Sequence, residues 1–218
     1  MKKYIFLLVA TIILGLVAGN KASGQVGCEV CVSPLPGSCY ELTFSIPGCC
    51  DSLTAVFCYE CGVTRPSITL YVAEISYCPQ CEDAAWDFVH QWALDNIDKL
   101  CGSWPCNTPP PFEVYYTVPV CAEVQWNGAT GRVTVRAHPG SCDKRCTEKY
   151  EWCRDYSTTP PTTQRRLVER YPSGNGTCEY FPYGNAPGTP PEYQYDPNIN
   201  WRLECVRNLA KPTCPQYP

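Results

Sequence analysis

The chain contains few of the side chains that enzymes most often use for acid–base or nucleophilic chemistry. Only two histidines, His90 and His138, occur among its 218 residues. The Gly-x-Ser-x-Gly and His-Glu-x-x-His patterns of common hydrolases are absent, and so is a phosphate-binding glycine loop. We therefore predict no catalytic residue and no cofactor, and we favour a non-enzymatic role.

Positive charge is also scarce. Three of the 17 Lys and Arg residues lie within the first 24 positions, which leaves 14 basic against 21 acidic side chains, a net charge of −7. Such a chain lacks the basic surface that binding to nucleic acid or anionic lipid requires. Arg165 and Arg166 form a tight basic pair, and we expect them on a solvated strand or loop edge.

Residues 1–24 have the features of a secretory signal peptide. Two lysines precede an apolar run that ends at Val17, and small residues at 22–24 suit cleavage. No later stretch reaches the apolar length of a transmembrane helix. We expect the mature part, 25–218, to be secreted, not membrane-spanning after signal cleavage, and located in the periplasm or at the cell surface.

Cysteine is what the chain has in abundance. All 18 cysteines follow residue 24, so about 9% of the mature chain is cysteine, near the level of a disulfide scaffold. An even number in an oxidising compartment predicts nine disulfides, although the pairing cannot be read from the sequence. The candidate half-cystines are Cys28, Cys31, Cys39, Cys49, Cys50, Cys58, Cys61, Cys78, Cys81, Cys101, Cys106, Cys121, Cys142, Cys146, Cys153, Cys178, Cys205 and Cys214.

Residues 79–100 form the one clear helix in the pattern. Pro79 suits the first turn, and Gly102 can close the last one. Phe88 falls off the apolar stripe, so it is expected to meet another surface or to be exposed. At a period of 3.6 residues, the apolar stripe consists of Trp86, Val89, Ala93, Ile97 and Leu100.

The rest of the chain reads as short strands and turns. β-branched and aromatic runs flank "GVTRP" at 62–66, "NGATG" at 127–131 and "STTPPTTQ" at 157–164, which predicts hairpins. The predicted fold class is α+β, disulfide-rich, with largely antiparallel strands and one main helix. We predict a single domain over 25–218, with a possible subdivision near 103–112 and a Pro- and Tyr-rich C-terminal segment over 182–218.

Cys78-Pro79-Gln80-Cys81 stands between a β-like run and the helix. This strand, Cys-x-x-Cys, helix order resembles the thioredoxin family over 68–95, which implies a reactive Cys78 and a resolving Cys81. Departures from the family are the Pro-rich connector, which leaves little room for a further helix, and the many other cysteines. A thiol–disulfide oxidoreductase is therefore kept as an alternative, while structural bridges to distant cysteines are favoured. The Cys-x-x-Cys spacing also occurs in zinc sites, but disulfide formation in an oxidising compartment competes with zinc binding. We therefore predict no metal site.

Aromatic residues on Pro-stiffened loops suggest a binding surface, for which the candidates are Tyr193, Tyr195 and Trp201. We therefore predict a secreted binding or structural accessory protein of the cell envelope or surface. Its partner is expected to be another envelope or surface protein, or a glycan. A carbohydrate-binding module is the second alternative.

Overall fold

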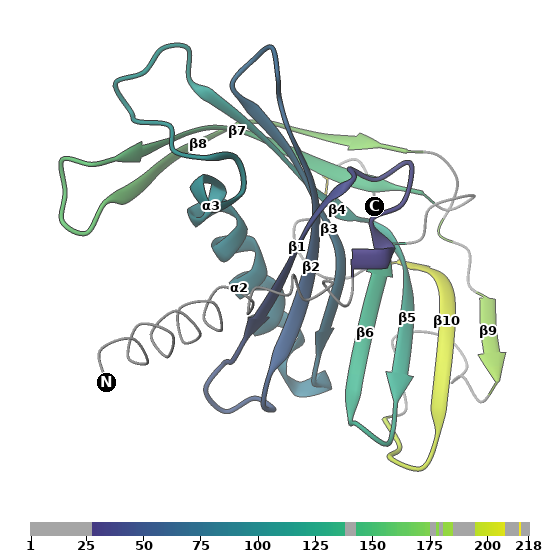
Figure 1. Cartoon of the computed structure of the whole chain (residues 1–218). Coiled ribbons are helices and arrows are strands. Elements are labelled where there is room, and N and C mark those ends of the chain that lie inside the picture. The colour runs from purple at the N-terminus through teal and green to yellow at the C-terminus, as the bar shows by residue number, and fades with distance from the viewer. Residues whose placement is uncertain are drawn as a thin grey trace, which may run out of the picture.

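The computed structural model (Figure 1) describes residues 28–137, 143–174, 178, 181–184, 195–207 and 214. The predicted signal peptide lies outside the described residues. Within them, no helix is both long and apolar enough to cross a membrane. The elements are η1 (Cys28–Val30), β1 (Ser38–Phe44), β2 (Leu53–Cys61), β3 (Ser67–Tyr77), η2 (Pro79–Cys81), α2 (Glu82–Asp95), α3 (Ile97–Cys101), β4 (Phe112–Pro119), β5 (Cys121–Asn127), β6 (Arg132–Ala137), β7 (Arg145–Asp155), β8 (Thr162–Ser173), β9 (Phe181–Gly184) and β10 (Asn200–Arg207).

The ten described strands form one sheet, and strands account for 51% of the described residues. The predicted α+β class therefore fits only loosely, because the sheet dominates. All strand pairs are antiparallel except β3 and β4, which run parallel with α2 and α3 between them in the chain. The predicted hairpins β2–β3, β5–β6 and β7–β8 are confirmed.

Strand β3 is the point at which the sheet divides into two parts. On one side, β3 pairs with β2 along almost its whole length. Its other side pairs with β4 over residues 67–71 and with β6 over 74–77. One part of the sheet therefore contains β1, β2, β4, β7 and β8, and the other contains β6, β5, β10 and β9.

The first part of the sheet curls around α2, which lies in its concave side (Figure 1). On one flank of the helix, Trp92 stacks on Tyr40 of β1, with 5.0 Å between ring centroids. On the other flank, Asp95 accepts a hydrogen bond from Arg165 of β8 at 3.1 Å. Both outer strands of this curled part therefore contact the same helix.

The predicted apolar stripe of the helix is confirmed. Four of its residues, Trp86, Val89, Ala93 and Ile97, are buried against the sheet, and Leu100 is half-buried against the same core. The polar opposite face is exposed or half-buried. The helical segment is divided at Asn96, whose side-chain amide donates to the Trp92 carbonyl. It ends at Gly102, which adopts φ +82°, a conformation that favours glycine.

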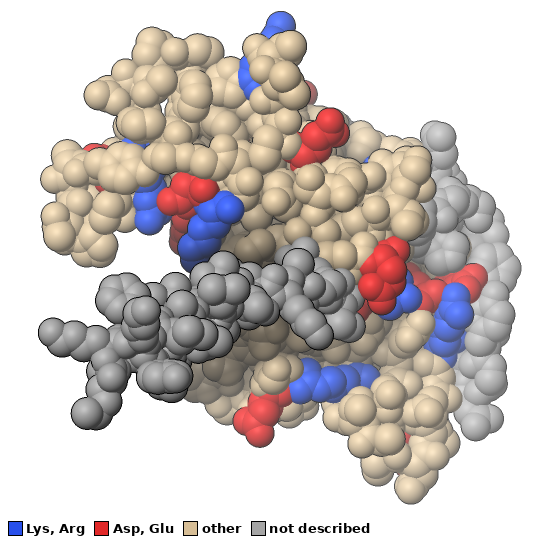
Figure 2. Space-filling view, in the orientation of Figure 1, with Lys and Arg blue, Asp and Glu red and all other residues tan. Residues whose placement is uncertain are grey.

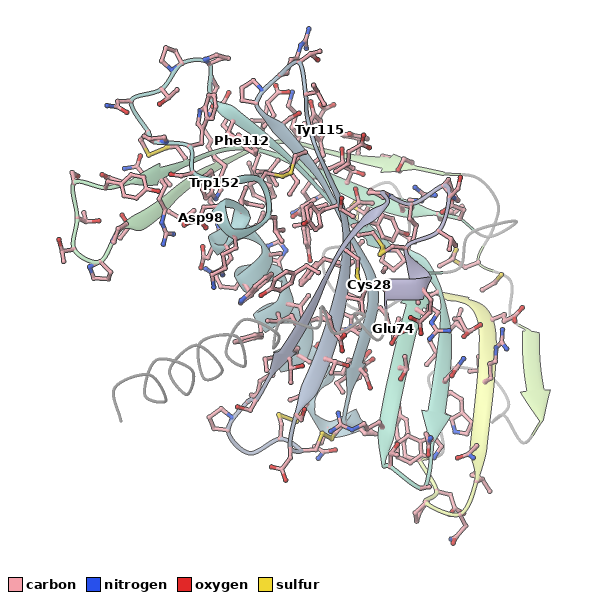
Figure 3. The ribbon with its side chains drawn as sticks, in the orientation of Figure 1. Cys28, Glu74, Asp98, Phe112, Tyr115 and Trp152 are labelled. Atoms are coloured by element: carbon pink, nitrogen blue, oxygen red, sulfur yellow. A yellow bond between two sulfur atoms is a disulfide. The ribbon has the colours of Figure 1, made fainter. Side chains whose placement is uncertain are left out.

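The Pro-rich connector between α3 and β4 packs on the end of the helix. Trp104 and Trp152 both contact the ring of Phe112, and the Trp152 indole N–H donates to the Leu94 carbonyl at 2.7 Å. Figure 3 shows Phe112 and Trp152 in this position. The connector also continues the sheet, because Arg154 of β7 exchanges backbone hydrogen bonds with Trp104 and Cys106.

The described part of the C-terminal segment packs against the β5–β6 hairpin. Strand β10 pairs with β5, and residues 195–200 pass over the turn of the hairpin. A Cβ atom on Gly128 would lie 2.5 Å from the carbonyl oxygens of Pro197 and Ile199. Only glycine therefore permits this close approach.

Eight disulfides join described cysteines, and no described cysteine is free. Because disulfides persist in oxidising compartments, this number is compatible with an extracellular protein. Cys205 is also disulfide-bonded, and Cys142 lies outside the described residues. The described bridges are 28–39, 31–58, 49–81, 50–78, 61–101, 106–153, 121–178 and 146–214.

Candidate functional site

The Cys-x-x-Cys motif forms two bridges to distant cysteines. Cys78 is bonded to Cys50 and Cys81 to Cys49, with Cα–Cα distances of 6.1 and 5.9 Å. Both motif cysteines are only 4% exposed. The bridges fix the N-terminal end of the helix to the loop between β1 and β2, and a third bridge, Cys61–Cys101, fixes its C-terminal end to β2. This arrangement suits structural cross-links, because the two cysteines of a redox-active pair must be accessible and must form a disulfide with each other.

The aromatic residues proposed for the C-terminal segment are not an exposed group. Trp201 is 3% exposed and belongs to the core, so it cannot contribute to a surface in this structure. Half-buried Tyr195 lies 5.1 Å from the ring of Trp126 and 6.1 Å from that of Trp201. Tyr193 lies outside the described residues. The pattern of Tyr and Trp among Pro and Asn predicted exposure, but the pairing of β10 with β5 draws Trp201 inward.

Strand β8 forms one outer edge of the curled sheet, as the sequence predicts for Arg165 and Arg166. This edge has features that discourage pairing with another strand. Its register with β7 shifts between Lys149 and Tyr150, and Pro172 lacks a backbone donor. Three arginines also lie along it, and each is held in an ion pair. Leu167 and Val168 are each 45% exposed near the register shift. Even so, these features do not favour a long regular pairing of β8 with a strand of another molecule.

Strand β1 forms the opposite outer edge and lacks these features. All seven of its residues pair with β2 without a register shift. The strand contains no proline, and Glu41 is its only charged residue. Among the described residues β1 pairs with β2 alone, so one row of its backbone N–H and C=O groups has no strand beside it. Such an edge can accept an additional strand.

An aromatic group lies directly beside this edge. We call it the β1–α2 aromatic patch, and it consists of Tyr40, Phe44, Phe88 and Trp92. The rings of Phe44 and Phe88 stack with centroids 4.5 Å apart, and Trp92 stacks on Tyr40. Phe88 remains 36% exposed, so it both meets another surface and faces solvent. The off-stripe position of Phe88 was the only signal of this patch in the sequence.

Exposed charges near the patch are mainly negative. Asp87 directly precedes Phe88 on the exposed face of α2, and Asp83 lies about one turn before Asp87. Lys99 lies 5.7 Å above the ring of Trp92. A ligand that covered the patch would therefore meet both apolar rings and carboxylates.

A buried polar cluster lies under the other flank of the helix. Glu148 is 1% exposed and accepts hydrogen bonds from Tyr150, at 2.5 Å, and from Arg170, at 2.6 Å. The ring of His90 contacts Tyr116 edge-on at 5.0 Å, and the His90 Nδ1 and Tyr116 hydroxyl have no hydrogen-bond partner in the described part of the chain. Burial lowers the pKa of His90 and raises that of Tyr116 well above its usual value. Because Glu148 is buried and paired with Arg170, we assign this cluster a structural role.

Charged side chains elsewhere lie in small groups of mixed sign, as Figure 2 shows for one face. Examples are the ion pairs Arg136–Glu74, Lys149–Glu113 and Arg166–Glu151. In the part of the chain that the structure describes, no group of three or more His, Cys, Asp or Glu side chains is placed to hold a metal ion.

Comparisons of the chain with protein-family models, with curated proteins and with solved structures find no match. The candidate site is therefore defined by geometry alone, namely the regular free edge of β1 and the half-exposed ring of Phe88 beside it.

Proposed function

We propose that the protein is a secreted, non-enzymatic binding protein of the cell envelope or surface that accepts an extended segment of a partner protein along β1. The observation that carries this proposal is the regular edge of β1 beside the β1–α2 aromatic patch. Backbone hydrogen bonds to the edge would supply affinity, and side-chain contacts with the patch would supply specificity.

The chemistry of the edge defines the segment that would bind. Tyr40 and Phe44 lie on the helix side of β1, where they contact Trp92 and Phe88. Side chains of an added strand alternate between the two faces of the sheet. Every second residue of the partner would therefore lie beside these rings, which favours apolar residues there. The carboxylates of Asp83 and Asp87 favour a basic residue in the same segment.

Binding would bury the exposed part of Phe88. With 36% of its surface exposed and roughly 200 Å² for a whole aromatic side chain, about 70 Å² would become buried. At about 25 cal/mol per Å² this contributes about 1.8 kcal/mol, or roughly 20-fold in affinity.

A randomised peptide library tests the proposal. Selection on the immobilised protein should enrich peptides with alternating apolar residues and at least one basic residue. Phe88→Ala should weaken the selected peptides roughly 20-fold, whereas Leu167→Ser on the edge of β8 should leave their affinity unchanged. Circular dichroism would verify that both variants fold. Failure to enrich such peptides, or equal binding by Phe88→Ala, would contradict the proposal.

The two alternatives have less support. The oxidoreductase alternative requires an accessible Cys78–Cys81 pair, whereas each of these buried cysteines is bonded elsewhere. A carbohydrate-binding module requires exposed aromatic rings, and the burial of Trp201 removes one of the candidates. We therefore retain protein binding as the proposed function.

A further inference from the structure

One disulfide differs from the others in its exposure and surroundings. Cys106 is the only described cysteine that is exposed, and its partner Cys153 is half-buried. Both line a cleft of about 560 Å³ between the Pro-rich connector and the β7–β8 hairpin. This volume falls in the range of small-molecule sites.

More arginines than carboxylates line the cleft. Arg165 and Arg166 line it together with a single carboxylate, that of Glu151. Arg166 forms an ion pair with Glu151 at 2.6 Å, yet 71% of the arginine side chain is exposed. Arg165 is paired with Asp95, at 3.1 Å, which does not line the cleft. The guanidinium groups favour an anionic ligand, and they also stabilise a thiolate that forms nearby.

We propose that Cys106–Cys153 is a thiol–disulfide exchange site for a small anionic thiol. The thiolate of the small molecule attacks the Sγ atom of Cys106. A new disulfide forms between the thiol and Cys106, the Cys106–Cys153 bond breaks, and Cys153 leaves as a thiolate. A second thiol of the same kind then attacks the mixed disulfide, which releases Cys106 and the oxidised small-molecule disulfide. In total the protein disulfide gains two electrons, and the two thiols lose them.

Backbone contacts keep the two cysteines close when the bond opens. The Cys106 N–H donates to the Arg154 carbonyl at 3.1 Å, and the Arg154 N–H donates to the Trp104 carbonyl at 2.8 Å. The Trp104 indole N–H also donates to Thr108 and Pro110 carbonyls within the connector. Exchange at this site is therefore reversible and leaves the fold intact. The proposal is independent of the binding function at β1.

Timed thiol treatment of the folded full-length mature protein tests the proposal. Glutathione, which is anionic, and cysteamine, which is cationic, would each be added, and free thiols would be trapped by alkylation and located by peptide mapping. Each rate would be normalised to that of the same thiol with a small reference disulfide, because intrinsic thiol reactivities differ. We expect Cys106–Cys153 to open at least about tenfold faster than buried Cys50–Cys78, with glutathione favoured over cysteamine.

Arg166→Gln should remove the preference for glutathione, while the matched variant Arg132→Gln, outside the cleft, should retain it. Opening of any other bridge before Cys106–Cys153 would overturn the site. Equal normalised rates for the two thiols, or a preference that survives Arg166→Gln, would overturn the assignment to an anionic thiol. Retention of the near-UV circular dichroism spectrum after opening is expected, and its loss would contradict a reversible site.

Discussion

Removing the two bridges at the start of the helix, singly and together, tests whether they act as one cross-link. Cys49–Cys81 closes a loop with a sequence separation of 32, and Cys50–Cys78 lies inside it with a separation of 28. The variants are Cys49→Ala/Cys81→Ala, Cys50→Ala/Cys78→Ala and the combination of all four substitutions. Each leaves an even number of cysteines.

The nesting of the two loops determines the expected costs. In the chain-entropy treatment, a bridge lowers the entropy of the unfolded chain by about 2.1 + 1.5R ln n cal/mol/K for a loop of n residues. A separation of 32 gives about 3.7 kcal/mol at about 25 °C. When one bridge is present, the other closes only a ring of about six residues, which are 49, 50 and 78–81, and contributes about 2.2 kcal/mol. Loss of either bridge should therefore cost about 2 kcal/mol, and loss of both about 6 kcal/mol.

Urea denaturation followed by tryptophan fluorescence measures these costs, and non-reducing peptide mapping verifies the remaining bridges. The double loss should exceed the sum of the single losses by about 1.5 kcal/mol. If either single loss costs as much as the double loss, the two bridges are not redundant and the reasoning is wrong. A Cys78–Cys81 bond in the native protein would contradict the structural role of both.

Three further predictions concern the concave side of the sheet. Burial lowers the pKa of His90, so the unfolded chain binds a proton more readily and the free energy of unfolding should fall as the pH drops below about 6.5. In His90→Asn the urea midpoint should change less between about pH 7.5 and 5.5 than in the wild type, and an unchanged pH profile would contradict this reasoning. Arg170→Met should lower the free energy of unfolding, measured by urea denaturation, by about 2–3 kcal/mol because Glu148 loses its charged partner, and adding Glu148→Gln should restore part of this loss. If Arg170→Met has no effect on stability, the ion pair contributes nothing. Phe57→Ala should cost about 3–5 kcal/mol because this fully buried ring would leave a cavity, and a thermal melt unchanged from wild type would place the ring outside the core.

Features that depend on neighbouring residues were predictable from the sequence. The helix over 79–100 was recognised from its apolar period, and its stripe is buried. The hairpins β5–β6 and β7–β8 were recognised from turn residues between β-like runs. In these cases the local pattern and the tertiary packing favour the same structure.

Features that depend on distant pairing were not predictable. Nothing local to 67–77 indicates that β3 pairs with β4 along one half and with β6 along the other. The choice among cysteine partners likewise follows from the assembled sheet. Trp201 was predicted to be exposed because its local composition resembles a loop, but pairing of β10 with β5 buries it. The candidate site requires both β1 and Phe88, which come together only when the helix packs in the curled sheet.

The position of β10 has a consequence for the order in which the chain is made. Strand β5 has β6 on one side and β10 on the other, and synthesis completes the β5–β6 hairpin long before residues 200–207 emerge. During that interval the nascent chain carries an open strand edge whose inner face includes Val124 and Trp126. A chain that terminates before Asn200 would keep this edge open permanently and would present a template for pairing between molecules. Strand β10 thus covers the open edge of β5 and ends the period in which that edge could pair with another molecule.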